Sequence, residues 1–271
     1  MVLKNTILYV ILIFIGILTI TPFLWMLSAS FMADGHASVY PPRFFPDKII
    51  FDQYRNLFSR LNVAVNFFNS LFLSVTVTLI SLLFNSMAGF AFAKYHFKAK
   101  NTLFKILLSS MIVPAQVTML PLFLMLKSMG FINTYMAIII PGMANIFGIF
   151  LIRQYVLSIP DSLIEAARID GASDFKIYKS IILPLCKPIL TTLAIFTFMG
   201  TWNDFLWPLI SLTDESMYTL PVALANLMKE HTRDIELMMA GSVVTIQPVL
   251  IVFMILQKYY MQGIILSGLK E

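Results

Sequence analysis

Long apolar segments dominate the chain and alternate with shorter polar ones. Six of them are long enough to cross a bilayer, because about 20 apolar residues in a helix span its hydrocarbon core. They lie at about 7–30, 67–93, 102–127, 134–154, 186–212 and 237–260. Several contain proline, which bundled membrane helices tolerate because neighbouring groups satisfy the freed carbonyls. The pattern predicts an all-α polytopic membrane protein with six transmembrane helices.

The composition supports this class of protein. Of the 271 residues, 59% are hydrophobic and 12% are charged, whereas a soluble domain carries roughly 25% charged residues. This leaves too little polar surface to coat a water-soluble globule of this length. The net charge of +5 does not indicate a nucleic-acid partner, because no basic cluster with interleaved aromatic residues occurs. No repeat divides the chain, and we expect one transmembrane domain over residues 1–271.

The first apolar segment has two interpretations. A secretory signal peptide has an apolar core of about 7–15 residues, followed by a cleavage site of small residues. The segment from about Ile7 to Leu27 is longer than that, and Ser28-Ala29-Ser30 is only a weak cleavage motif. We therefore predict an uncleaved first transmembrane helix.

The basic residues predict the direction of insertion, because Lys and Arg gather in cytoplasmic loops. If the N-terminus is cytoplasmic, most of the 19 Lys and Arg residues fall on the inside. The short loop 94–105 then carries four lysines and no acid, and the outer segment 214–236 has more acids than bases. We predict that both termini and the polar loop 155–185 are cytoplasmic.

The loop 155–185 predicts two short helices joined by a tight turn. Ser162 and Glu165 have the spacing of a capping box, in which the two residues satisfy each other's free backbone N–H groups. Gly171 is placed to end the first helix in the left-handed conformation. Ser173 is placed to cap the second helix.

One face of the first helix is rich in small residues. Helical spacing puts on this face Leu163, Ala166, Ala167 and Asp170. Because alanine lets a helix backbone approach closely, this face suits docking in a groove of another protein. From the residues alone, an amphipathic connector lying on the lipid surface explains the face equally well.

At these residues the chain resembles a known family. The segments that resemble the EAA signature of bacterial ABC importer permeases are Glu165-Ala166-Ala167, Asp170-Gly171-Ala172 and Ile181-Ile182-Leu183-Pro184. Segments at 91–95, 114–118 and 201–208 resemble the maltose-type carbohydrate branch of that family. The resemblance therefore covers nearly the whole chain.

The resemblance implies a coupling helix, which docks on a cytoplasmic ATPase and transmits its ATP-driven closure to the membrane helices. The residues that fall on the motif are Glu165, Ala166, Ala167, Asp170 and Gly171. It also implies a bacterial inner-membrane location and three partners. These are a second permease in a heterodimer, two copies of the ABC ATPase and an extracytoplasmic solute-binding protein. After the last span only about 267–271 remain for a second ATPase contact.

The chain carries no pattern for chemistry of its own. It lacks the G-x-x-x-x-G-K-[ST] phosphate-binding loop, so we expect ATP and Mg²⁺ on the partner ATPase and no cofactor here. The single cysteine, Cys186, excludes an intramolecular disulfide. His36, His96 and His231 lie in separate loops. We therefore predict no metal site, no catalytic residue and no enzyme activity.

Polar residues inside the predicted spans are candidates for a solute pathway. The candidates are Gln116, Asn145, Asn203, Asp204 and Gln247. Asp204 is the only acid deep in a predicted span, where ionisable groups are costly and often functional. It is either a structural residue that faces the bundle or a gate that contacts the solute.

The second span carries a stripe of small and polar residues on one helical face. The stripe consists of Ser70, Ser74, Thr78, Ser81, Asn85 and Gly89. Such residues let membrane helices pack closely, and they also suit the lining of a pathway. The outer segment 31–66 has two interpretations as well, because it either meets an external binding protein or covers the bundle.

The function that these patterns favour is a permease subunit of an ATP-driven sugar importer, forming half of the membrane pathway. One alternative is an importer permease for another solute, such as a polyol, glycerol phosphate or a peptide. A secondary transporter would need paired intramembrane acids or an internal repeat. A membrane enzyme would need clustered His, Asp or Glu residues. Neither pattern occurs in the sequence.

Overall fold

The computed structural model describes residues 2–41, 43–230 and 234–268, with side chains for residues 5–41, 43–227 and 234–255. His231 and residues 269–271 of the C-terminal tail lie outside this part. Every regular element in the described ranges is helical, which confirms the prediction of an all-α chain. The chain divides into two compact units, Met1–Asn66 with Leu220–Pro248, and Phe67–Thr219 with Val249–Glu271. The expected single domain stays a prediction.

The first unit holds α1 (Val2–Ala29), α2 (Asp52–Arg60), α13 (Leu220–Glu230) and the first part of α14 (Ile235–Gly268). α1 is apolar along its length, and its side chains from residue 5 to residue 28 are exposed or half-buried within the chain. This is typical of a helix whose surroundings are lipid. Buried Glu236 accepts a hydrogen bond of 2.6 Å from the backbone N–H of Ala37, so the segment after α1 is fixed to the start of α14.

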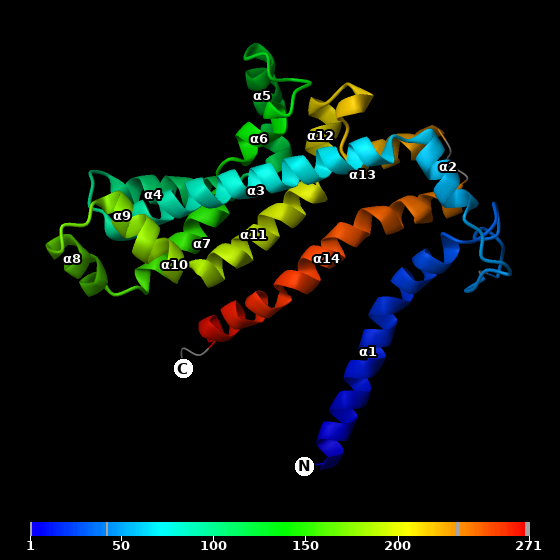
Figure 1. The fold of residues 1–271 in the computed structure, drawn as a ribbon, viewed down its shortest axis with the longest axis horizontal. Helices are drawn as coiled ribbons and strands as arrows, with labels where there is room; N and C mark the ends of the chain where they lie inside the picture. Colours follow the sequence, from blue (N-terminus) through cyan, green and yellow to red (C-terminus); the bar gives the residue numbers. More distant parts are fainter. Residues whose placement is uncertain (1, 42, 231–233, 269–271) are drawn as a thin grey trace. The chain divides into compact units, whose positions relative to one another are not determined.

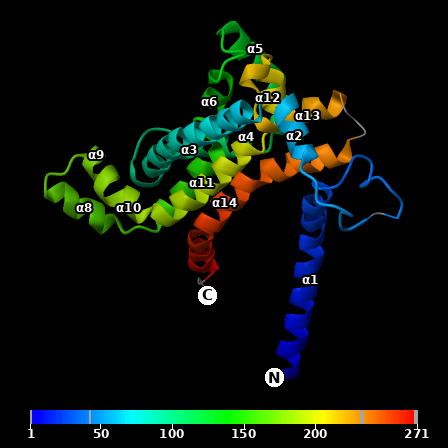
Figure 2. The same cartoon turned by 45° about the vertical axis from the view of Figure 1, so that its right-hand side comes forward.

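The second unit begins with α3, which Figures 1 and 2 show running between two groups of short helices. The bounds of its elements are α3 (Val63–Lys94), α4 (Lys100–Ser110), α5 (Ala115–Ser128), α6 (Met136–Gly142), α7 (Ile146–Leu157), α8 (Asp161–Ile169), α9 (Asp174–Ile177), a π-helical turn (Tyr178–Ile182), α10 (Leu183–Leu185), α11 (Lys187–Trp202), α12 (Leu206–Ser211) and a 3₁₀ turn (Glu215–Met217). α8, α9 and α10 lie near one end of α3, and α5, α6 and α12 lie farther along it, beside its middle part (Figure 1).

Four helical segments in the described part are each long and apolar enough to cross a membrane. They are Asn5–Ala29, Val63–Lys94, Met136–Leu157 and Ile235–Ile255. Two further candidates are bent, by 104° between α4 and α5 and by 79° between α10 and α11. The described chain therefore has four to six candidate spans, and the count of six stays a prediction.

Proline explains both bends. Pro114 precedes α5 with an extended ψ of 136°, and a proline pushes the residue before it away from helical geometry. Pro188 is the second residue of α11; it lacks a backbone N–H donor, and its ring clashes with a preceding carbonyl. The predicted spans 102–127 and 186–212 are thus wrong as single helices. The second also stops at Trp202, before a break that leads into α12.

The polar stripe of α3 is buried inside the second unit. Ser81 accepts a hydrogen bond of 2.8 Å from the side-chain amide of Asn85. A Cβ atom added at Gly89 would lie 2.6 Å from the side chain of Ile152, so α3 and α7 approach closely at a position that only glycine permits. The burial of the stripe favours helix packing over lining of a pathway.

Candidate functional site

The helix α8 begins two residues earlier than the predicted cap at Ser162 implies. Pro160 precedes it with a φ of −60° and no side chain caps the first turn. Pro160 occupies the N-cap position, where it has no N–H group to satisfy and its ring blocks continuation of a helix from the preceding residues. Ser162 therefore lies inside the first turn, and the predicted capping box with Glu165 is wrong. Asp161 instead starts the helix, where a carboxylate is stabilised by the helix dipole.

The turn after α8 follows the predicted pattern. Gly171 has a φ of +77°, which glycine adopts at little cost. The N–H of Ala172 donates to the carbonyl of Ala167 at 2.9 Å, and the N–H of Gly171 donates to that of Arg168 at 3.0 Å. This pair of bonds is a Schellman motif. The Ser173 hydroxyl then accepts from the N–H of Lys176 at 3.4 Å and caps α9.

The side chains of α8 divide into an inward and an outward set. Ile164 is buried, and Ala167 packs against the same apolar cluster, which contains Phe90 and Ile177. The exposed members of the helix include Leu163, Glu165, Ala166, Ile169 and Asp170. Of the face expected from helical spacing, Leu163, Ala166 and Asp170 are exposed, and their docking role stays a prediction. Ala167 is half-buried and packs against the chain's own core, because it lies one turn from Ile164.

Sequence reasoning missed Ile169, which is 86% exposed at the end of α8. An apolar side chain this exposed lies on the same side of the segment as the motif residues. Its exposure could have been predicted from helical spacing. Ile169 lies five residues after Ile164, on a different face of the helix, and directly precedes Asp170-Gly171.

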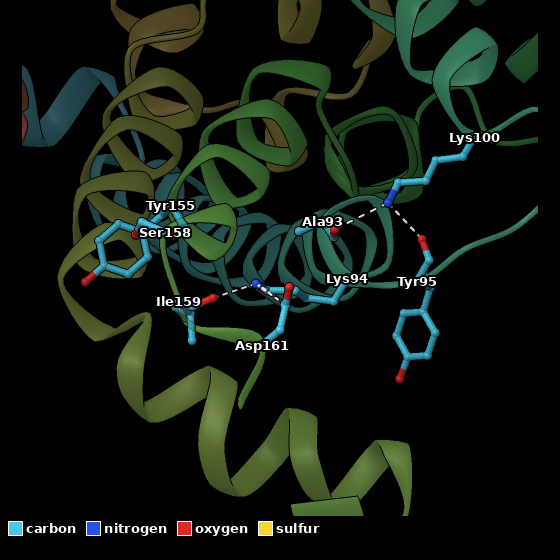
Figure 3. A network of polar contacts seen from close by, with 8 residues as sticks. All are labelled: Ala93, Lys94, Tyr95, Lys100, Tyr155, Ser158, Ile159 and Asp161. Atoms are coloured by element: carbon cyan, nitrogen blue, oxygen red, sulfur yellow. Dashed lines mark hydrogen bonds and ion pairs between the residues drawn. The ribbon is translucent and has the colours of Figure 1, made fainter. Parts of the chain in front are cut away.

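A network of polar contacts joins α8 to the end of α3 (Figure 3). The Nζ atom of Lys94 donates to the carbonyl of Ile159 at 2.5 Å and to Oδ1 of Asp161 at 2.6 Å. The Lys94 side chain is only 7% exposed, whereas that of Asp161 is 72% exposed. The hydrogen bond from Lys94, together with its charge, lowers the pKa of Asp161 below its ordinary value.

Lys100 closes the end of α3. Its Nζ atom donates to the carbonyls of Ala93 at 3.3 Å and Tyr95 at 2.7 Å, as Figure 3 shows. These are among the last carbonyls of the helix and have no partner within it, and a cation near the negative end of the helix dipole is favourable. The loop that carries Lys94, Tyr95 and Lys100 is therefore held in a defined conformation.

The other end of α8 meets the same loop. The guanidinium carbon of Arg168 lies 5.9 Å from the ring centre of Tyr95, within the range of a cation–π contact. Arg168 also pairs with Asp174 at 3.2 Å. Burial, followed by the hydrogen bond with Asp174, raises the pKa of Tyr95. The first residue of α8 thus contacts Lys94, and its last turn contacts Tyr95.

A cavity of about 600 Å³ borders the middle of α3, where Val77 lies on its wall. Three of the five pathway candidates, Gln116, Asn203 and Asp204, lie along its wall. Thr201 and Trp207 are also on the wall, and the sequence analysis did not name them as candidates. A threonine or a tryptophan in a membrane helix is a weak signal of a pathway, because both residue types are common there.

Asp204 lies at the break between α11 and α12. Its carboxylate accepts a hydrogen bond of 3.4 Å from the N–H of Trp207, in the first turn of α12, so it has a structural role in addition to its place on the cavity wall. The indole N–H of Trp207 donates to the carbonyl of Ala137 at 2.9 Å and fixes that ring.

The remaining two candidates lie elsewhere. Asn145 caps α7, where its Oδ1 accepts from the N–H of Gly148 at 2.6 Å. Its own N–H donates to Asn85 at 3.0 Å, so it joins α7 to α3 and does not line the cavity. Gln247 is exposed on α14 in the first unit. Among the side chains described, no group of three His, Cys, Asp or Glu residues is arranged to hold a metal ion.

Comparison with known proteins identifies the family. The chain matches the family described as "Binding-protein-dependent transport system inner membrane component" over residues 85–265. It is 36% identical to the arabinooligosaccharides transport system permease protein AraQ of Halalkalibacterium halodurans, over 95% of this chain and 93% of that protein. It is 28% identical to the lactose transport system permease protein LacG of Rhizobium radiobacter, again over 95% and 93%.

A solved structure gives the same result for the fold. The chain superposes on a chain of a bacterial ABC transporter involved in the import of the acidic polysaccharide alginate, with a TM-score of 0.83. The sequence identity is 26%, and the match covers 95% of this chain and 96% of that one. The resemblance found in the EAA segment is therefore confirmed over almost the full length. The chain belongs to the family of binding-protein-dependent transport system inner membrane components, and it is a transport permease and not an enzyme.

Proposed function

We propose that this chain is one of two permease subunits of an ATP-driven carbohydrate importer and that α8 couples it to the ATPase. Relatives that carry arabinooligosaccharide and lactose names support a carbohydrate cargo. In this proposal the second permease is a related chain, two ATPase copies bind ATP and Mg²⁺, and a binding protein delivers the sugar. α8 and both termini lie on the cytoplasmic side.

The observation that carries the coupling role is the exposed surface of the EAA segment. Leu163, Glu165, Ala166 and Ile169 project from a short helix whose end is fixed by the Gly171 turn. Leu163 and Ile169 expose two large apolar side chains on this short helix, which supports a contact with another protein. The side chain of Ile164 anchors the opposite face in the core, so the helix transmits force applied to its free face.

The wall of the cavity favours a neutral sugar. It combines amide and hydroxyl groups with the ring of Trp207, and sugars are bound by hydrogen bonds and by aromatic faces. Among the described residues that line it there is one acid, Asp204, and no Lys or Arg. Because a carboxylate without a neighbouring cation repels anions, the cavity argues against glycerol phosphate. A polyol remains the second candidate cargo.

A cross-linking experiment tests the coupling role. Ala166 is exposed on α8, and the native Cys186 is buried, so Ala166→Cys introduces an accessible thiol. In membranes that contain the intact transporter, we expect a cross-link from this position to the ATPase. The matched control is Leu120→Cys, exposed on α5, which should give none. Absence of an ATPase adduct from Ala166→Cys, with the transporter assembled, would overturn the assignment.

A further inference from the structure

The contacts of Lys94 are unusual for a lysine at the end of a membrane helix. Its side chain is 7% exposed, and an ammonium group removed from water must be paired or hydrogen-bonded. Both partners belong to the entry of α8, since the carbonyl of Ile159 and the carboxylate of Asp161 flank Pro160. Lys94 therefore fixes the point at which the chain enters α8.

Tyr95 provides a second contact at the far end of the same helix. α8 has nine residues, so its ends are about 13 Å apart. Lys94 holds the first residue, and Tyr95 contacts Arg168 in the last turn. Contacts at two points restrict both the position and the tilt of a helix, which a single contact cannot do.

An apolar cluster also joins α8 to α3. Ile164, at the middle of α8, is 4% exposed and shares a core cluster with Phe90 of α3. The rings of Phe90 and Tyr95 are 5.2 Å apart and nearly perpendicular, which is a favourable aromatic geometry. The last turn of α3 thus forms a continuous support under α8.

The same helix reaches the cavity. Val77 of α3 lies on the cavity wall and is 17 residues before Lys94, which corresponds to about 25 Å along the helix. α3 is an unbroken helix between these residues. One continuous helix therefore connects the contact at Lys94 with the cavity wall at Val77.

We propose that Lys94 is a positioning residue that ties α8 to α3, with Tyr95 as its second support, so that displacement of α8 by the ATPase moves α3. This inference rests on the coupling role proposed for α8. It names α3 as the element that receives the displacement, in addition to the covalent connection through α7.

The test uses the whole transporter, with its binding protein and ATPase, reconstituted in lipid vesicles. Lys94→Met removes the charge at nearly constant volume, and Lys94→Arg retains a cation. Asp161→Asn weakens the ion pair with Lys94. Because the Asp161 side chain is 72% exposed, this substitution should not unfold the chain. The matched control is Lys98→Met, because Lys98 is exposed in the same loop. The readouts are sugar molecules transported per ATP hydrolysed and the Ala166→Cys cross-link.

We expect Lys94→Met to lower transport per ATP at least about threefold while the ATPase cross-link keeps its yield. Asp161→Asn should lower the ratio by less, Lys94→Arg should restore most of it, and Lys98→Met should leave it unchanged. An unchanged ratio in both Lys94→Met and Asp161→Asn would overturn the proposal. So would equal damage by Lys94→Arg, or loss of the cross-link in Lys94→Met, because Lys94 would then only hold α8 folded.

The two proposals fail in different ways. If native α8 carries no coupling function, the cross-link from Ala166→Cys is absent without any change at Lys94. If α8 couples to the ATPase but Lys94 does not transmit its displacement to α3, the cross-link is present. The ratio of sugar transported to ATP hydrolysed is then the same in Lys94→Met as in the native chain.

Discussion

The hydroxyl groups of Tyr178 and Ser86 lie 2.7 Å apart in the interior of the second unit. Ser86 donates its own proton to the carbonyl of Leu82 at 2.6 Å, so Tyr178 is the donor in the pair. The Tyr178 ring also stacks on Phe90, with ring centres 6.1 Å apart. The segment that follows α9 is thereby joined to α3 by one hydrogen bond and one ring contact.

This direction of donation predicts unequal effects of two small substitutions. Tyr178→Phe leaves Ser86 bonded to Leu82, so it should lower the free energy of unfolding by only about 0.6 to 1 kcal/mol. Ser86→Ala leaves the buried Tyr178 hydroxyl without an acceptor and should lower it by about 1 to 3 kcal/mol. Unfolding of the purified chain in detergent measures both. Equal effects, or a larger effect of Tyr178→Phe, would contradict the assigned direction.

Gly171 lies in the turn after α8, and Gly200, inside α11, is a matched control for substitution by alanine. A Cβ atom meets nothing within 4 Å at either position, but only Gly171 has a positive φ. Gly171→Ala should therefore destabilise the chain by about 1 kcal/mol or more through backbone strain alone. Gly200→Ala, inside α11, should be neutral or slightly stabilising. Thermal unfolding of the two variants side by side measures the difference. Equal shifts would show that the left-handed turn is not needed.

The hydropathy pattern predicted most of the fold, because a helix that crosses lipid must be long and apolar. The same pattern missed the bends at Pro114 and Pro188, since tolerance of proline depends on neighbours that are not visible in one segment. The turn at Gly171 and the cap at Ser173 were predictable because their hydrogen bonds are local. The predicted start of α8 was wrong because Pro160, two residues before Ser162, takes the N-cap position.

The candidate site was predictable only in part, for a related reason. The exposed motif residues of α8 follow from helical spacing, but the inward direction of Ala167 depends on Phe90 and Ile177, far away in the chain. The partners of Lys94 are 65 and 67 residues away in sequence. Asn145 looked like a pathway residue because it is polar and within a span, yet it is used as a helix cap.

Two substitutions at Asp204 separate its structural and transport roles. Asparagine accepts hydrogen bonds at a helix start as aspartate does, so Asp204→Asn should leave stability and abundance nearly unchanged. If the carboxylate contacts the cargo, Asp204→Asn should raise the KM for uptake about tenfold, the equivalent of about 1.4 kcal/mol. Asp204→Ala should in addition lose about 1 kcal/mol of stability.

Asn145→Ala serves as the control for Asp204, since it caps a helix away from the cavity. It should lower stability and leave the KM unchanged. Uptake kinetics and thermal unfolding on the same preparations give both quantities. An unchanged KM in Asp204→Asn would mean that Asp204 is structural only.

The Lys94–Asp161 pair predicts a pH dependence of stability. Because Lys94 lowers the pKa of Asp161 in the folded chain, the stabilisation is complete above the unfolded value of about 3.9 and is lost as the pH falls through the folded value. The difference in Tm between the native chain and Asp161→Asn should be constant from about pH 8 to about pH 5 and should shrink below about pH 4. A difference that grows on acidification would contradict the pairing.

Glu165→Lys provides the most direct measurement of the central claim that α8 couples this permease to its ATPase. Glu165 is exposed, so a reversed charge should disturb only the docking surface and leave insertion and stability unchanged. In the reconstituted transporter we expect sugar uptake per ATP hydrolysed to fall at least about tenfold, while Lys98→Glu, reversed in sign at another exposed position, keeps the native ratio. Native uptake per ATP in Glu165→Lys would contradict the account.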